Sequence, residues 1–238
     1  MIKIENTEVY GWKAAIRGMR NPMNSWNKSD SIMCDGIIMK CDREKCTQPY
    51  NCDYCIGNND LKLMKKLVAA GSDHSKFMRM INVTCDITAP LYFWKQLDCY
   101  KVGTVRNSCS TMHKIQAKEF TLDDFSHEHL ITTEIDTENP SLVKVPVLFT
   151  LESVICQLNF CREKYLETND KLWWWQMIQL LPSSYNQRST VQLNYAVLRN
   201  MYHARKNHKL DCWRDFCKWV ESLPFSELIT MKGNGGAK

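Results

Sequence analysis

The sequence predicts a single domain that contains both helices and strands. Apolar residues recur at helical spacing in several segments, and an alternating apolar run ends at Pro90. No internal repeat, low-complexity tract or clear linker divides the 238 residues. This length suits one large domain with a sizeable core, so we expect residues 1–238 to fold as one domain.

The amino-terminal part is expected to contain one short strand and two helices. Residues 2–5 have the pattern of a short strand, and residues 12–20 have helical spacing that a following proline stops. A polar, Cys-rich stretch at about residues 24–59 shows little periodicity, which is typical of an insertion. The second helix, at about residues 61–70, follows a capping Asn-Asp pair and ends before a glycine.

The central part combines one strand with one helix and two polar segments. Residues 78–87 alternate between apolar and polar positions, which predicts a strand, and residues 91–101 have helical spacing. Residues 103–114 are rich in Gly, Ser, Thr and Asn, which predicts a loop, and residues 121–143 are acidic and polar. Further helices are expected at about residues 146–167, 169–181, 190–207 and 210–222.

Composition excludes several classes of protein. Apolar residues make up 44% and charged residues 24%, which excludes a mostly disordered chain. Lys and Arg number 31 and Asp and Glu 26, a net charge of +5, and this balance is too mild to predict a specific nucleic-acid partner. No apolar run approaches the roughly 20 residues of a membrane span. The first residues lack an apolar signal core, so we expect a cytoplasmic protein.

Twelve cysteines are many for a chain of this kind, and several cluster in the expected insertion. Cys52 and Cys55 have the two-residue spacing of a zinc half-site, and Cys41 and Cys46 could supply the other half with a wider spacing. The alternative is a set of reduced, partly buried thiols in a loop, since thiols in the cytosol stay reduced.

One expected helix carries a candidate ligand-binding stripe. Asn194 and Arg205 are eleven residues apart, about three helical turns, so they would project in nearly the same direction. A guanidinium aligned with a carboxamide could contact a phosphate or a pyrimidine, because both present acceptor oxygens. A solvated helix face is the alternative interpretation.

Two segments, which occur in the family's order along the chain, resemble a known family, the flavin-dependent thymidylate synthases. In the first, the family has an Ala-Pro helix start, a [RK]-Gln pair, an Arg-His-Arg-x-x-Ser motif and a closing Ser-x-Arg-Tyr. The matching positions here are Ala89-Pro90, Lys95-Gln96, Cys99-Tyr100-Lys101 with Thr104, and Cys109 with Thr111 and Met112.

The second segment resembles the family's Leu-Pro … Asn … Asn-x-x-x-x-Arg helix. The positions that keep its spacing are Leu181-Pro182, Asn194, Asn200 and Arg205, and Trp213 resembles the aromatic residue that follows. Upstream, the stretch around His74 resembles the family's Gly-His-x-x-x-Phe turn, with the histidine displaced.

The resemblance implies an α+β fold in a single domain, with a mixed or antiparallel sheet flanked by helices, and a homotetramer. It also implies an enzyme that uses FAD, reduced by NADPH, to pass a methylene group from methylenetetrahydrofolate to dUMP or a related pyrimidine nucleotide. No catalytic protein nucleophile is expected. The implied substrate-binding residues are Gln96, Lys101, Thr104, Cys109 and Arg205, and the implied cofactor-binding residues are His74, Asn194, Asn200 and His208.

The sequence departs from the family pattern in its charges. Cys99 and Lys101 stand at two arginine positions of the motif, and Thr111 stands at the arginine of the closing loop. Two alternatives therefore remain beside thymidylate synthesis. One is a divergent relative with other chemistry at the pyrimidine C5, such as hydroxymethylation, and the other is a non-catalytic protein that binds a nucleotide or a metal.

Overall fold

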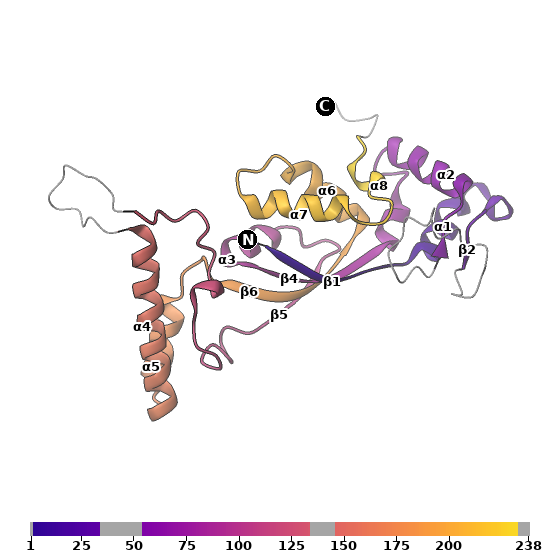
Figure 1. Ribbon diagram of the computed structural model, residues 1–238. Helices are drawn as coiled ribbons and strands as arrows, with labels where there is room; N and C mark the ends of the chain where they lie inside the picture. Colours follow the sequence, from indigo (N-terminus) through magenta and orange to yellow (C-terminus); the bar gives the residue numbers. More distant parts are fainter. Residues whose placement is uncertain (1, 34–53, 134–145, 233–238) are drawn as a thin grey trace, which may run out of the picture. The chain divides into compact units, whose positions relative to one another are not determined.

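The computed structural model describes residues 2–33, 54–133 and 146–232, and combines helices with strands (Figure 1). The α-helices of this part are α1 (Trp12–Arg20), α2 (Asn58–Ala69), α3 (Leu91–Leu97), α4 (Val147–Thr168), α5 (Lys171–Leu180), α6 (Tyr195–Arg205), α7 (Asp211–Glu221) and α8 (Glu227–Thr230). Its 3₁₀ turns are η1 (Asn21–Met23), η2 (Trp26–Lys28), η3 (Lys76–Met80) and η4 (Leu122–Asp124). Its strands are β1 (Lys3–Tyr10), β2 (Ile32–Met33), β3 (Tyr54–Cys55), β4 (Asn82–Pro90), β5 (Val105–Ser108) and β6 (Asn186–Asn194). The predicted α+β class is confirmed.

Four strands form one sheet in the order β1-β4-β6-β5. Along β4 the side chains alternate, because successive residues of a strand point to opposite faces. The buried set is Val83, Cys85, Ile87 and Ala89. On the opposite face, the Asp86 carboxylate accepts hydrogen bonds from Asn6 of β1 and Thr190 of β6. One face of this part of the sheet therefore packs in the core, and the other is tied together by polar side chains.

The chain divides into two compact units. The first consists of Met1–Lys3, Thr88–Leu97 and Ser108–Ser189, and the second of Ile4–Ile87, Asp98–Asn107 and Thr190–Lys238. The prediction that residues 1–238 form a single domain stays a prediction. None of the helices in the described part of the chain is both long enough and apolar enough to cross a membrane.

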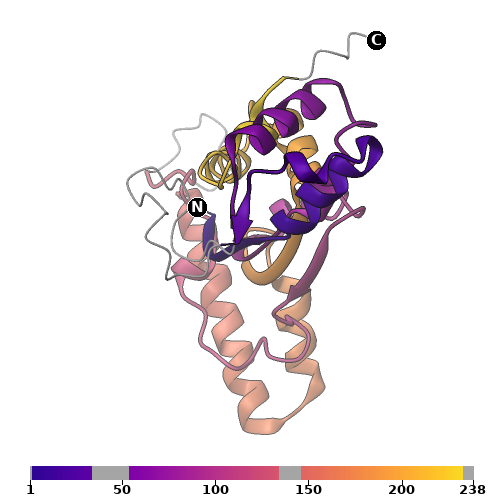
Figure 2. The same ribbon diagram turned by 90° about the vertical axis from the view of Figure 1, so that its right-hand side faces the viewer.

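In the first unit, α4 and α5 form an antiparallel pair that Figures 1 and 2 both show side by side. The two helices pack against residues 115–125 and form a core with them. This core contains Ile115, Phe120, Phe125, Leu151, Ile155, Leu158, Cys161 and Met177. Several large apolar side chains of the two helices stay exposed outside this core.

In the second unit, α6 is the central helix and packs against α7, α8 and η3. Its apolar face is buried, as the spacing predicts, and it contains Val197, Leu198, Met201 and Tyr202. Trp12 at the start of α1 packs edge-on against the Tyr195 ring, with 5.3 Å between the ring centroids. The amino-terminal helix and α6 thus share one core.

Five predicted elements differ from the structure. The predicted strand at 2–5 continues to Tyr10, and the predicted helix at 91–101 ends at Leu97. The predicted helix at 190–207 is two elements, because β6 continues to Asn194 and α6 begins at Tyr195. The predicted loop at 103–114 contains the edge strand β5. The predicted strand at 78–87 begins later, at Asn82, after the 3₁₀ turn η3.

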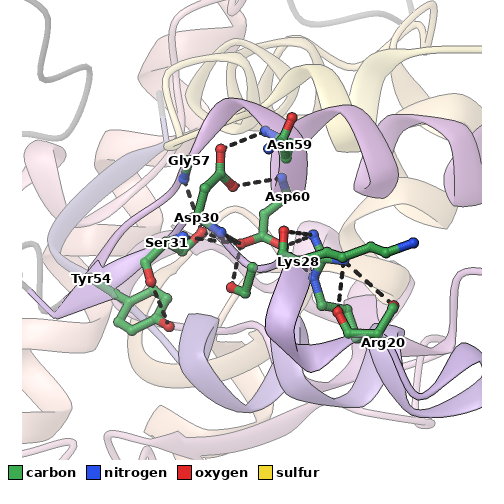
Figure 3. A network of polar contacts seen from close by, with 10 residues as sticks. Arg20, Lys28, Asp30, Ser31, Tyr54, Gly57, Asn59 and Asp60 are labelled. Carbon is green, nitrogen blue, oxygen red and sulfur yellow. Dashed lines mark hydrogen bonds and ion pairs between the residues drawn. The ribbon is translucent and has the colours of Figure 1, made fainter.

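The ends of the Cys-rich insertion are held together by a polar cluster, which we call the insertion clamp and which comprises Arg20, Ser29, Asp30, Ser31 and Asp60 (Figure 3). Arg20 and Asp60 are 4% and 0% exposed, and the Arg20 Nε donates to Asp60 Oδ1 at 2.7 Å. Asp60 Oδ2 accepts from the hydroxyls of Ser29 and Ser31 at 2.7 and 2.6 Å. The Asp30 carboxylate accepts backbone N–H groups in the first turn of α2.

The short strands β2 and β3 also join the two ends of the insertion, and together with the clamp they form its base. They pair antiparallel, with Ile32 opposite Cys55 and Met33 opposite Tyr54. The chain therefore enters and leaves the insertion at adjacent points. Its sequence-predicted metal ligands Cys41, Cys46 and Cys52 lie outside the described residues, while Cys55 is half-buried in β3. Within the described ranges, no group of three or more His, Cys, Asp or Glu residues is placed to hold a metal ion. A zinc site formed by the four cysteines stays a prediction.

Candidate functional site

The segment between α3 and β5 lies against α6 in the second unit. Gly103, in this segment, has a φ of +80°, a backbone conformation that favours glycine. A Cβ atom at this position would lie 2.4 Å from the Asn194 side-chain nitrogen. Glycine therefore lets the backbone of the family-like motif approach the start of α6 closely.

Asn194 is the N-cap of α6. Its Oδ1 accepts a hydrogen bond from the Val197 N–H at 3.0 Å, which satisfies one of the N–H groups that a helix start leaves unpaired. The expectation that Asn194 and Arg205 share one helix face is therefore wrong, because Asn194 precedes the helix and Arg205 is its last residue. The side-chain nitrogen of Asn194 faces Gly103, on the motif side.

Arg205 is held by two aromatic rings at the other end of α6. Its Nε donates to the Tyr100 hydroxyl at 2.9 Å, and the centre of the guanidinium lies 5.6 Å from the centroid of the Tyr100 ring. The same guanidinium lies 4.9 Å from the centroid of the Trp213 ring, which is fully buried. Cation–π contacts of this kind orient an arginine without neutralising its charge. We call Tyr100, Arg205 and Trp213 the arginine cluster.

His208 follows the cluster in the turn between α6 and α7. Its Nδ1 accepts a hydrogen bond from the Leu210 N–H at 3.2 Å, which places the proton of the neutral ring on Nε2. Burial lowers the pKa of His208, and the positive charges of Arg205, Lys209 and Arg214 lower it further. At neutral pH, His208 is therefore a neutral residue that can donate one hydrogen bond from Nε2.

Thr104, which takes the serine position of the motif, contributes a buried hydroxyl. In the part of the chain that the structure describes, this oxygen has no hydrogen-bond partner. A buried polar atom without a partner costs about 1–3 kcal/mol, so such atoms are often satisfied by a ligand or by ordered water. Thr104 thus directly follows Gly103, whose backbone lies close to the Asn194 side chain.

The other predicted site residues are distributed as follows. Gln96 is half-buried in α3, and Cys109 is exposed just after β5, and both belong to the first unit. Lys101, Asn200 and His74 belong to the second unit and are exposed, in the motif segment, on α6 and in the turn after α2, respectively. That Gln96 and Arg205 share one ligand stays a prediction.

Sequence reasoning did not assign Tyr100 or Trp213 to the site, although both were noted as parts of the family-like segments. The available signal was their residue type. Tyr100, an aromatic residue at the histidine position of the motif, and Trp213, eight residues after Arg205, are suited to hold a guanidinium. Which aromatic residue meets which cation depends on contacts far apart in the sequence.

Comparisons with known proteins identify this arrangement of elements. No family model matches the sequence, and no curated protein matches it either. A flavin-dependent thymidylate synthase, ThyX, from Helicobacter pylori, complexed with FAD and dUMP, matches the structure with a TM-score of 0.61. The match covers 95% of this chain and 96% of that chain, at 15% identity. The chain has the flavin-dependent thymidylate synthase fold.

Two further structures with this fold agree. A second structure of Helicobacter pylori ThyX with FAD and dUMP has a TM-score of 0.60 at 14% identity and covers 96% of each chain. A UMP/dUMP methylase, PolB, from Streptomyces cacaoi, bound with 5-Br dUMP, has a TM-score of 0.56 at 14% identity. The PolB match covers 98% of this chain and 97% of that chain. The elements that carry the arginine cluster are therefore part of a fold shared over nearly the whole chain.

Proposed function

We propose that this protein binds FAD and dUMP, or a related pyrimidine deoxynucleotide, and methylates the uracil ring with methylenetetrahydrofolate and NADPH. The observation that carries the proposal is that a fold known with FAD and dUMP bound covers almost the whole chain, while the two family-like segments meet at the arginine cluster. PolB, whose name gives methylation of UMP or dUMP, supports the same substrate class.

The residues present fit these ligands. The Arg205 guanidinium is pre-oriented by Tyr100 and Trp213, so it loses little side-chain freedom when it binds a phosphate or a pyrimidine oxygen. Gln96, Lys101 and Cys109 are proposed to contact the nucleotide as well. Thr104 offers a buried hydroxyl whose hydrogen-bonding capacity is unused in the described structure, which suits a polar group of the ligand.

The flavin side of the site is proposed to lie along α6. Asn194 uses its oxygen for the helix cap, so its side-chain nitrogen is the group that can donate to the cofactor. His208 can donate from Nε2 because it is neutral, and Asn200 and His74 are exposed and able to contribute further polar contacts. When bound, the reduced flavin would supply the electrons for the transfer of the one-carbon unit, and the protein residues would bind and orient the partners.

The motif has fewer positive charges than the family pattern. Cys99 and Thr111 are neutral, and Lys101 is a point charge that cannot make the two-pronged contact of an arginine. Each charge-assisted hydrogen bond contributes about 1.5–3 kcal/mol, so fewer arginines imply weaker phosphate binding. We expect Arg205 to carry a large share of the nucleotide affinity for this reason.

The homotetramer is also proposed. Seven large apolar side chains of α4 and α5 are exposed in the described part of the chain, and these are Val147, Phe149, Phe160, Leu166, Leu172, Trp175 and Leu180. Such a surface suits contact with a second copy of the chain. Light scattering coupled to size-exclusion chromatography should give four times the mass of one chain, and a monomeric mass would contradict the assembly.

The binding test uses the purified protein and its Arg205→Ala variant. An absorption spectrum with flavin bands in the untreated protein is expected, and a colourless protein would contradict the FAD proposal. Calorimetric titration should show that Arg205→Ala weakens dUMP binding by about 1.5–3 kcal/mol, or about 10-fold to 100-fold in Kd. The control Arg79→Ala removes an exposed arginine of η3 and should bind dUMP like the wild type.

The reaction test separates methylation from the alternatives. Release of tritium from dUMP labelled at carbon five, with methylenetetrahydrofolate and NADPH supplied, is expected for thymidylate synthesis. Mass analysis of the product then distinguishes a methyl group from a hydroxymethyl group. Tight dUMP binding without tritium release would instead indicate a non-catalytic nucleotide-binding protein.

A further inference from the structure

A pocket in the second unit lies beside α1, away from the residues assigned above. Its volume is about 550 Å³, within the range of about 300–1,000 Å³ typical of small-molecule sites. The residues that line it come from α1, from the two 3₁₀ turns after α1 and from the base of the insertion, and they are Lys13, Ile16, Arg17, Arg20, Asn21, Trp26, Ser29 and Tyr54.

The pocket is positively charged. Lys13 and Arg17 lie one turn apart on the exposed side of α1, so their side chains are neighbours. In the described part of the chain, Arg17 makes no hydrogen bond or ion pair, and the Lys13 ammonium contacts the Met33 sulfur at 3.6 Å. The third cation, Arg20, is neutralised by Asp60 in the insertion clamp. The eight lining residues include no Asp or Glu, so two positive charges remain for a ligand.

The pocket also offers an aromatic surface in a fixed position. The Trp26 side chain is 50% exposed, and its Nε1 donates to the Asn21 side-chain oxygen at 2.8 Å, which holds the ring in place. The clamp fixes the neighbouring residue Ser29 through its hydrogen bond to Asp60, and Tyr54 enters from β3. The walls of the pocket are therefore organised before any ligand binds.

We propose that this pocket binds a mononucleotide, with the phosphate between Lys13 and Arg17 and the base against the Trp26 ring. A phosphate is a strong partner for closely spaced lysine and arginine side chains, and any nucleobase presents a flat face to an indole. The inference does not depend on the function proposed above, because the pocket shares no residue with the arginine cluster or with the predicted flavin contacts.

Calorimetric titration of the full-length protein with AMP and GMP tests the proposal, because these purine nucleotides do not match the pyrimidine site proposed above. We expect saturable binding of at least one of them. Arg17→Gln and Lys13→Gln should each weaken it by about 10-fold or more, because each removes a charge-assisted hydrogen bond. Trp26→Ala should weaken binding by a similar factor through loss of stacking. The changed side chains are exposed or line the open pocket, so these variants should unfold at the wild-type temperature.

Two controls define the outcome. Lys62→Gln removes an exposed charge from α2 outside the pocket and should bind like the wild type, and Arg205→Ala should as well. Nucleotide affinity that is unchanged in the Arg17, Lys13 and Trp26 variants, or no binding of either nucleotide, overturns the proposal. If inorganic phosphate binds as tightly as AMP, the pocket is an anion site without base stacking. If a short single-stranded oligonucleotide binds far more tightly than AMP, the occupant is a nucleic acid. Either result overturns the assignment to a mononucleotide.

Discussion

Two arginines of the second unit are held in opposite ways. Arg20 is buried, and its charge is balanced by the Asp60 carboxylate at 2.6 Å inside the insertion clamp. Arg205 is half-buried and is positioned by the hydroxyl of Tyr100 and the face of Trp213. A carboxylate neutralises a guanidinium and fixes the chain around it, whereas aromatic rings fix the guanidinium and preserve its charge. The first arrangement suits a structural role, and the second suits ligand binding.

This contrast predicts that removal of the insertion clamp and removal of the arginine cluster have different consequences. The clamp joins residues 20, 29–31 and 60, which are far apart in the sequence, so its loss should appear in the free energy of unfolding. Removal of the Arg205 side chain keeps the Tyr100 and Trp213 rings, so its loss should appear mainly in ligand affinity. The experiments below test this division, beginning with the largest expected effect.

Asp60→Ala should lower the free energy of unfolding by about 3–5 kcal/mol, because it leaves the Arg20 charge buried without its partner. Urea denaturation followed by circular dichroism measures the change. The double variant Arg20→Met with Asp60→Leu should recover only part of the loss, since it leaves no buried charge but still leaves the Ser29 and Ser31 hydroxyls without their acceptor. A loss below about 1 kcal/mol in Asp60→Ala would show that the clamp is not structural.

Acid should weaken the insertion clamp. Burial tends to raise the pKa of Asp60, but hydrogen bonds from Ser31, Ser29 and Arg20, together with the Arg20 charge, outweigh it and lower the pKa below its ordinary value of 3.8. The carboxylate therefore stabilises the fold fully above about pH 4–5, and this stabilisation is lost as the pH falls through the lowered pKa. Urea midpoints of the wild type should fall below pH 4 more steeply than those of Asp60→Asn, and parallel curves would exclude this contribution.

Gly103→Ala should destabilise the protein by about 1–3 kcal/mol and disturb the motif, because the new Cβ would meet the Asn194 side chain in a backbone conformation unfavourable to alanine. Gly71→Ala is a matched control, since Gly71 also has a positive φ but has no atom within 4 Å of the new Cβ. The difference in stability loss between the two variants measures the cost of the contact with the Asn194 side chain. Thermal unfolding gives the stabilities, and equal losses would show that Asn194 can move away without cost.

Tyr100→Phe should have the smallest effect on stability, about 0.5–1.5 kcal/mol, because it removes one hydrogen bond to Arg205 and keeps the ring. If the hydroxyl orients the guanidinium for the nucleotide, dUMP affinity should fall as well. Tyr10→Phe, at an exposed tyrosine of β1, serves as the control for the loss of a hydroxyl group. Unchanged dUMP affinity in Tyr100→Phe would show that Trp213 alone is sufficient to orient Arg205.

Much of the fold follows from local patterns. The bounds of α1 match the prediction, because helical spacing is followed directly by Pro22. The second half of β6 and the whole of α6 were predicted as one helix at 190–207, although the buried residues Ser189, Val191 and Leu193 alternate with more exposed ones. That alternation is the signal of a half-buried strand, and the helical spacing just beyond it obscured the boundary.

The candidate site was predicted in part. The family-like segments located Arg205 and Asn194, but the reason given for their alignment was wrong because Asn194 caps the helix. Arg199, a charged residue of the same helix, donates to the backbone oxygens of Leu228 and Ile229, and burial lowers its pKa. The Arg199 contacts reach α8, an element that the helix pattern does not describe.

The sequence by itself determined the mixture of helices and strands, the helix limits set by proline and glycine, and the position of the insertion. These features depend on interactions between residues close along the chain, which spacing and residue type record. The tertiary structure decided that Tyr100 and Trp213 enclose Arg205, that Asp60 neutralises Arg20, and that Lys13 and Trp26 share a pocket. Each of these joins separate elements of the chain. Burial and the geometry of packing select such contacts from many combinations that the sequence alone leaves equally possible.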